Sequence, residues 1–153
     1  MKFRMVDRIL SWEPRTRICG TKTVSFEEYN CKAAFGGDAC LPESLLVESL
    51  FQLGNWLIVL TSDFTQMGLV VRMSEIRFED QVRPGSSLRL EVEAAAYRSD
   101  GVLLNGRALC GDRIVGIGTG CLATPVALAD YCNPDDLKVL FGEIYRPVPQ
   151  EGA

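Results

Sequence analysis

The sequence predicts an α+β domain in which one long buried helix is wrapped by a mostly antiparallel sheet. Three observations favour this fold. One long apolar stretch covers residues 44–62, strand-like segments bounded by turns lie on both sides of it, and the composition is globular. Of the 153 residues, 47% are hydrophobic and 24% are charged, which is enough apolar material for one core. We therefore expect a single domain over residues 1–153.

The central helix is expected to cover residues 42–62. A proline suits the first turn of a helix, and the carboxylate of Glu43 complements the helix dipole there. Apolar residues occupy most of the circumference, so we expect burial on several sides. Glu48, Gln52 and Asn55 recur at helical spacing and form one polar stripe along this helix.

The other elements are expected on either side of this helix. Residues 88–94 alternate between apolar and polar side chains, which is typical of a strand with one buried face. Near the end of the chain, Asn133 is placed to cap a helix within a C-terminal extension that covers residues 130–146. The expected strands cover residues 6–12, 17–24, 68–78, 87–97, 102–111 and 114–124.

The composition narrows the classes of function. A net charge of −4 gives no electrostatic reason to expect nucleic-acid binding. The chain has no histidine and no CxxC pair among its six cysteines, so we expect no metal site and no cofactor. The first residues lack the apolar stretch of a signal peptide, which favours free thiols in a reduced cytoplasm. Glu48 also argues against a membrane span, because a central acidic residue costs about 2.5–3.5 kcal/mol on insertion.

Glu48 is the most informative single residue, since no other charge lies within residues 44–62. Apolar surroundings disfavour the charged form of a carboxylic acid, which adapts such a side chain to proton transfer near neutral pH. The structural alternative is a buried acid that hydrogen-bonds to the backbone or to a partner subunit. For Gln52 and Asn55 the structural alternative to a catalytic role is that they are buried amides whose hydrogen bonds are made to the sheet.

Three blocks of sequence carry a family resemblance: residues 6–10, 41–52 and 76–88. Together they resemble the (3R)-hydroxyacyl-[acyl-carrier-protein] dehydratases of the FabZ type, in the order and spacing of that family, over about residues 5–125. The resemblance implies the hotdog fold, which agrees with the helix-in-sheet prediction. It also implies a homodimer or higher oligomer, an acyl-binding tunnel between subunits, and an acyl carrier protein or CoA thioester as partner.

The family's catalytic pair is a histidine followed fourteen residues later by a glutamate of the central helix. The glutamate corresponds to Glu48, whereas Ala34 occupies the histidine position. Alanine offers neither a proton nor a lone pair, and one general acid or base typically contributes about 10²–10⁴-fold in rate. Glu43 replaces a glycine whose backbone N–H helps to hold the thioester. The substrate-binding residues that the resemblance implies are Phe35, Gly37, Leu41, Pro42, Glu43 and Gln52.

Three functions are compatible with these residues. The first is a FabZ-like homologue of fatty-acid or polyketide-type metabolism that binds acyl thioesters, is impaired in dehydration, and can supply Glu48 to a histidine-bearing paralogue. The second is an acyl thioesterase that uses Glu48 as base or nucleophile and the helix start as oxyanion hole. The third is an active dehydratase with a substitute acid or base, namely Cys40, Asp38 or Tyr29.

Six arginines on the predicted strands and in the turns between them offer one further hypothesis, a docking patch for an acidic carrier protein. Solvated strand faces are the favoured interpretation, because the net charge is negative. The arginines concerned are Arg72, Arg77, Arg83, Arg89, Arg107 and Arg113.

Overall fold

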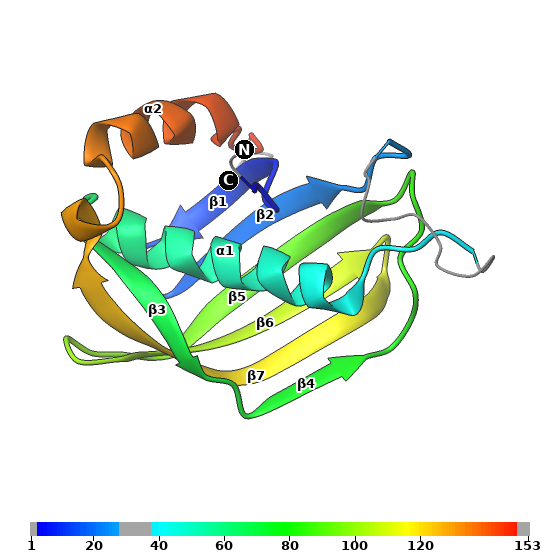
Figure 1. The fold of residues 1–153 in the computed structure, drawn as a ribbon, viewed down its shortest axis with the longest axis horizontal. Coiled ribbons are helices and arrows are strands. Elements are labelled where there is room, and N and C mark those ends of the chain that lie inside the picture. The colour runs from blue at the N-terminus through cyan, green and yellow to red at the C-terminus, as the bar shows by residue number, and fades with distance from the viewer. Residues whose placement is uncertain (1–2, 28–37, 150–153) are drawn as a thin grey trace.

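The computed structural model describes residues 3–27 and 38–149 (Figure 1). One long helix lies against a single sheet, and a second, shorter helix follows the last strand, which confirms the predicted α+β class. The elements are β1 (Arg8–Glu13), β2 (Arg17–Thr23), α1 (Glu43–Thr61), β3 (Gln66–Arg72), β4 (Glu75–Phe78), β5 (Ser87–Tyr97), β6 (Val102–Cys110), β7 (Arg113–Ala127), the short 3-10 helix η3 (Leu128–Asp130) and α2 (Pro134–Ile144).

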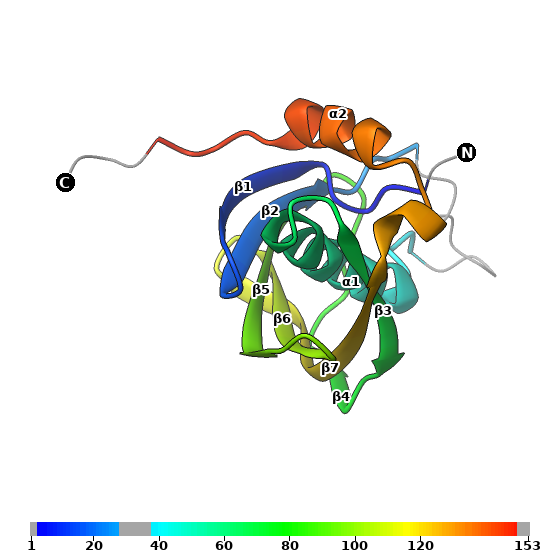
Figure 2. The same cartoon turned by 90° about the vertical axis from the view of Figure 1, so that its left-hand side faces the viewer.

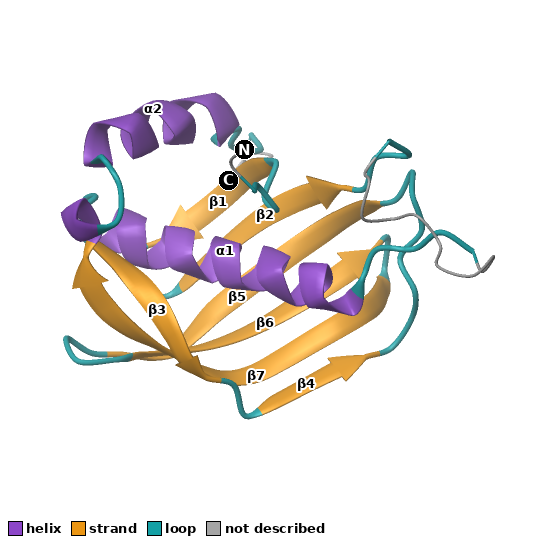
Figure 3. Ribbon diagram, viewed as in Figure 1, coloured by secondary structure: helices purple, strands orange, loops and turns teal. Residues whose placement is uncertain are grey.

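The sheet has seven strands in the order β1-β2-β5-β6-β7-β3, and β4 pairs with β7 beside β3. Every pair of neighbouring strands is antiparallel, as expected. The sheet curls around α1, so that strands lie on several sides of the helix when the molecule is seen from its end (Figures 2 and 3). This curvature leaves β1 and the β3–β4 segment as the two margins of the sheet.

The core lies between α1 and the concave face of the sheet. Leu53, Leu57 and Ile58 of the helix are completely buried. Along β5, Leu88, Leu90 and Val92 are buried whereas Arg89 and Glu93 are exposed, as the predicted alternation requires. The fully buried partners on the strands include Ile18, Leu88, Leu90, Val102 and Val115.

The observed α1 agrees with the predicted helix to within one residue at each end, because Pro42 and Ser62 are its caps. By length and hydropathy alone, α1 is also apolar enough to cross a bilayer. A core helix satisfies the same test, and here the helix contacts strands β2, β3, β5, β6 and β7. Its apolar circumference is therefore explained by packing inside the sheet.

One expected element is wrong in detail. Residues 68–78 were expected to form one strand, but they form β3 and β4 with a break between them. The long strand β7 pairs with both and bends at Gly120, which has a φ of 67°. Ser74 packs against this glycine and donates its backbone N–H to the Gly120 carbonyl at 3.2 Å. The partner strand must break where β7 bends, because the regular ladder cannot continue past the bend.

The C-terminal helix α2 lies over the C-terminal half of α1 (Figure 1). Asn133 caps it as predicted, since the side-chain oxygen accepts a hydrogen bond from the Asp135 backbone N–H at 3.0 Å. Phe141 anchors the helix through aromatic contacts, with ring centroids 6.0 Å from Trp56 and 4.9 Å from Tyr145. This helix therefore adds a wall beside α1 that the sheet does not supply.

Candidate functional site

The segment before α1 is held to the loop after β4 by a backbone hydrogen bond and an ion pair. Leu41, which is buried, donates its N–H to the Val82 carbonyl at 2.7 Å, and Asp38 pairs with Arg83 at 3.0 Å. Among residues 3–27 and 38–149, no side chain caps the helix at Pro42. The first N–H groups of a helix have no intrahelical partner, so this terminus is suited to binding an oxygen atom that carries negative charge.

Glu48 lies one turn into α1 and is half-buried. Its Oε1 atom accepts a hydrogen bond from Nε2 of Gln52 at 2.8 Å. The Gln52 amide is itself fixed by the N-terminal segment, because its Oε1 accepts the Met5 N–H at 2.8 Å and its Nε2 donates to the Phe3 carbonyl at 3.2 Å. A backbone N–H can bond only to the amide oxygen, so Met5 forces the NH₂ group of Gln52 towards Glu48.

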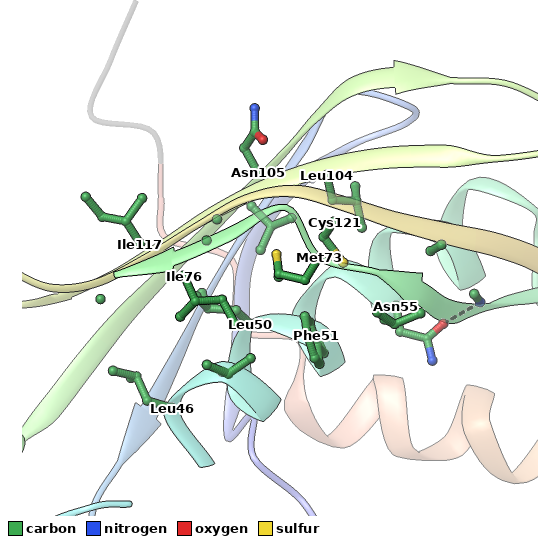
Figure 4. Close-up of a pocket in the computed structure, with 18 of the residues that line it drawn as sticks. Leu46, Leu50, Phe51, Asn55, Met73, Ile76, Leu104, Asn105, Ile117 and Cys121 are labelled. Atoms are coloured by element: carbon green, nitrogen blue, oxygen red, sulfur yellow. Dashed lines mark hydrogen bonds between the residues drawn. The ribbon is translucent and has the colours of Figure 1, made fainter. Parts of the chain in front are cut away.

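An apolar slot runs along the face of α1 that is turned towards β3, β4, β6 and β7 (Figure 4). Its free volume is about 30 Å³, so it is narrow. Val47 and Phe51, which flank Glu48 on the helix, both line it. The remaining walls include Leu46, Leu50, Met73, Ile76, Phe78, Leu104 and Ile117.

The slot opens at the β3–β4 margin of the sheet. Val70, Ile76 and Phe78 line it and yet are 42%, 38% and 37% exposed. Large apolar side chains at a sheet margin are suited to contact with a hydrocarbon chain or with another protein surface. The slot and the margin thus form one continuous apolar surface along α1, although Glu48 itself does not line the slot.

Asn55 is the polar boundary of the slot on α1. Its Oδ1 atom accepts the Gly68 N–H at 2.9 Å, which ties the helix to β3. In Figure 4 the amide nitrogen points away from Gly68, towards the side of the helix on which α2 lies. Asn55 lines both the slot and a separate cleft between α1 and α2, so its side chain stands between the two cavities.

The structure brings together only part of the residue set expected from the sequence. Leu41, Pro42 and Glu43 meet at the helix start, with Glu43 exposed, and Gln52 lies directly against Glu48. Ala34, Phe35 and Gly37 lie outside the described residues, and so does Tyr29.

The sequence analysis did not single out the slot residues. Phe51, Met73 and Ile76 line the slot together although β3 and β4 are far from α1 in the sequence. Because apolar residues occupy most of the α1 circumference, periodicity could not distinguish the slot face from the core faces.

Two expectations about other side chains can be compared with the structure. Five of the six arginines considered for the docking patch make ion pairs, which favours solvated surface charges over a free docking patch. Cys40 is half-buried with a free thiol. Burial raises the pKa of the Cys121 thiol beside the slot and that of Cys19 on β2, so both stay protonated at neutral pH.

Comparison with known proteins decides the family. The model of the FabA-like domain matches residues 1–117, which is most of the chain. The chain belongs to the FabA-like family. Among curated relatives of this FabA-like protein, 3-hydroxyacyl-[acyl-carrier-protein] dehydratase FabZ of Symbiobacterium thermophilum is 31% identical over 89% of this chain and 94% of its own length. The FabZ protein of Bacillus pumilus is 36% identical over 70% of this chain and 74% of its own length.

Solved structures agree on the fold, and they confirm the hotdog fold of this FabA-like protein. A Streptococcus mutans protein bound to acetyl CoA superposes with a TM-score of 0.63, over 78% of this chain and 88% of its own, at 11% identity. The dehydratase heterocomplex ApeI:P from Xenorhabdus doucetiae gives a TM-score of 0.58, over 74% of this chain and 92% of the other, at 14% identity. At such identities the likeness concerns the fold alone.

Proposed function

We propose that this FabA-like protein binds 3-hydroxyacyl thioesters of acyl carrier protein or CoA and acts as an incomplete FabZ-type dehydratase (a lyase) in the cytoplasm. Its place is in fatty-acid or polyketide-type metabolism, and it assembles as a homodimer or higher oligomer. The observation that carries the proposal is a contrast: curated relatives are dehydratases, and this chain contains no histidine at all.

The chemistry explains why that contrast matters. Dehydration removes a proton from C2 of the acyl chain and expels the C3 hydroxyl, which must gain a proton to leave as water. Two groups are needed, one to accept the first proton and one to donate the second. Glu48 offers one such group at the helix, and Ala34 stands where the family's histidine is expected. A homo-oligomer of this chain is therefore impaired in dehydration.

The geometry supports thioester binding independently of catalysis. The apolar slot along α1 suits a hydrocarbon chain, and the uncapped helix start suits the thioester carbonyl oxygen. Glu48 lies on the same helix, outside the lining of the slot, and Gln52 orients its carboxyl group.

A histidine-bearing paralogue can complete the site. In the FabZ family the histidine and the glutamate are attributed to opposite protomers, so a mixed dimer would pair Glu48 of this chain with a histidine of its partner. A fold neighbour of this protein is itself a dehydratase heterocomplex, and this supports the proposed mixed assembly.

The experiment compares dehydration of a 3-hydroxyacyl thioester by the pure protein and by its mixture with a histidine-bearing FabZ-like paralogue. We expect turnover by the pure protein to lie at least about 10²-fold below that of the mixture. In a mixture whose paralogue lacks its own helix glutamate, Glu48→Gln should abolish the activity. Rapid turnover by the pure protein that depends on Glu48 would overturn the proposal.

A thioesterase is the second candidate, and the uncapped N-terminus of α1 near Glu48 favours it. That terminus can stabilise the oxyanion formed when a base-activated water attacks the thioester carbonyl, with the thiolate leaving and taking up a proton. The test is release of free thiol from acyl-CoA and acyl carrier protein substrates of different chain lengths. Absence of thiol release at every length excludes this candidate.

The third candidate is a dehydratase with a substitute group at the vacated position. Asp38 is engaged by Arg83, whereas Cys40 is half-buried and free of a disulfide. Introducing the missing side chain by Ala34→His distinguishes the cases. A large gain in dehydration supports the incomplete pair, and an unchanged high rate that is lost in Cys40→Ala supports the substitute acid.

A further inference from the structure

The cleft between α1 and α2 is a second cavity, on the other side of Asn55 from the slot. Its volume is about 210 Å³, larger than that of the slot. Leu137, Leu140 and Ile144 of α2 form one wall, and α2 lies beyond residues 1–117, the part that matches the family model. The cleft is therefore not formed by residues 1–117 alone. Its other lining residues are Phe3, Arg4, Val6, Gln52, Asn55, Trp56 and Val59.

Two polar side chains that line the cleft, those of Arg4 and Asn55, offer hydrogen-bond donors, whereas Gln52 is already bonded to Met5, Phe3 and Glu48. Arg4 lines the cleft, is exposed, and makes no ion pair within the described part of the chain. Asn55 uses its oxygen to hold Gly68, which leaves its NH₂ group for another acceptor. None of the described residues that line the cleft is acidic.

The walls and the donors together define the chemistry of the occupant. Apolar side chains of α1, α2 and the N-terminal segment suit a hydrocarbon chain, and a guanidinium with an amide NH₂ suits a carboxylate. The volume lies below the roughly 300–1,000 Å³ of cavities that hold drug-sized ligands. We propose that the α1–α2 cleft binds a short- or medium-chain carboxylate, with its chain against α2 and its carboxylate at Arg4 and Asn55.

Occupation of this cleft bears on the candidate active site. Phe3 and Gln52 line the cleft, and the same two residues form the hydrogen bonds that orient Glu48. A carboxylate bound here contacts the residues that hold the Glu48 carboxyl group. The site goes beyond the proposed function, because it requires neither a thioester nor turnover.

The test uses octanoate as the probe and the full-length protein with Trp12→Phe, which leaves Trp56 as the only tryptophan and thus as a reporter in the cleft. We expect a saturable change in Trp56 fluorescence with a midpoint at or below about 1 mM octanoate. 1-Octanol, which has the same chain length without the charge, should bind more weakly.

Two substitutions of cleft residues, with one control, test whether octanoate binds in the cleft rather than in the slot. Leu137→Glu adds a carboxylate to the α2 wall and should weaken binding at least tenfold, whereas Val139→Glu, on an exposed position of the same helix, should not. Arg4→Gln should weaken binding about two- to fivefold, as expected for an exposed ion pair. Circular dichroism checks that each variant is folded.

Either of two results would overturn the inference: no saturable change with octanoate, or unchanged octanoate binding in both Leu137→Glu and Arg4→Gln. Because the assay contains no thioester, failure here leaves the dehydratase proposal unaffected, and failure of the dehydratase assay leaves this site unaffected.

Discussion

At the scale of single residues, Gln52 links the N-terminal segment to the candidate catalytic carboxyl group. One amide accepts the Met5 N–H and donates to both the Phe3 carbonyl and Glu48. The family resemblance marks this glutamine as a substrate-binding residue, whereas its contacts within the chain give it a positioning role. The side chain that Glu48 needs for its orientation is thus fixed by residues almost at the start of the chain.

Replacing this amide should therefore affect stability. Gln52→Ala leaves a backbone N–H and a carboxylate without their partner, and an unsatisfied group of this kind typically costs about 1–3 kcal/mol. The measurement is the free energy of unfolding from urea denaturation. Gln66→Ala is the matched control, because Gln66 is exposed at the start of β3 and should change stability by less than about 0.5 kcal/mol. Equal effects of the two substitutions would contradict the role of Gln52.

At the scale of elements, the two helices depend on their surroundings to different degrees. α1 is enclosed by strands, whereas α2 is attached through one face and buries only Ile144. Each helix contains a glycine, and the space around these glycines differs. A Cβ atom at Gly54 would lie 2.8 Å from Cδ1 of Leu104, whereas a Cβ atom at Gly142 would meet nothing within 4 Å.

Replacing glycine with alanine should thus change the free energy of unfolding in opposite directions in the two helices. Gly142→Ala should stabilise the protein by up to about 1 kcal/mol, the difference in helix propensity between the two residues. Gly54→Ala has the same propensity gain but overpacks the core, which typically costs about 1–3 kcal/mol, so we expect net destabilisation. Thermal and urea denaturation of both variants measure the effect. Stabilisation by Gly54→Ala would show that the core beside α1 is looser than these distances indicate.

The elements also show how far local sequence signals reach. The ends of α1, the extent of β5 and the Asn133 cap of α2 were all predicted, because apolar periodicity and capping residues act locally. The break between β3 and β4 was missed, since it depends on the bend at Gly120, distant in the sequence. A strand ends where its neighbour bends, and the neighbour cannot be identified from the strand itself.

At the scale of the whole molecule, the β3–β4 margin is the exposed apolar edge of the sheet. Val70 and Val71 are 42% and 60% exposed on β3, next to the opening of the slot. Edge strands with apolar side chains are sites of association. If two copies pair along this margin, the slot of each copy lies at the subunit boundary, where the predicted tunnel is expected.

Charge introduced at this margin should therefore disrupt assembly. We expect Val71→Lys to shift the protein towards monomer, because a lysine in an apolar contact loses its hydration. Light scattering coupled to size-exclusion chromatography measures the mass at a fixed concentration. Val139→Lys is the control, since Val139 is 66% exposed on α2, away from this margin. A monomeric parent protein, or a Val71→Lys variant of unchanged mass, would exclude assembly through β3.

The pH dependence of stability is a second property of the whole molecule. Burial raises the pKa of Cys19, of Cys121 and of Tyr97 above their ordinary values. Above about pH 9 the unfolded chain releases thiol protons that the folded protein retains, so the free energy of unfolding should fall as the pH rises. The double variant Cys19→Ala/Cys121→Ala should show a shallower decline in urea denaturation, whereas Cys132→Ala, at an exposed position, should not.

The sequence by itself determined the α+β class, the buried central helix, the position of Glu48 within it and the absence of histidine, because periodicity and composition are properties of the chain before it folds. The tertiary structure decided which side chains meet. Gln52 reaches back to Phe3 and Met5, Asn55 holds Gly68 between two cavities, and α2 closes a cleft beside α1. Each of these contacts joins segments that are separated in the sequence. On a helix whose circumference is mostly apolar, only the arrangement of the sheet determines which face lines a cavity.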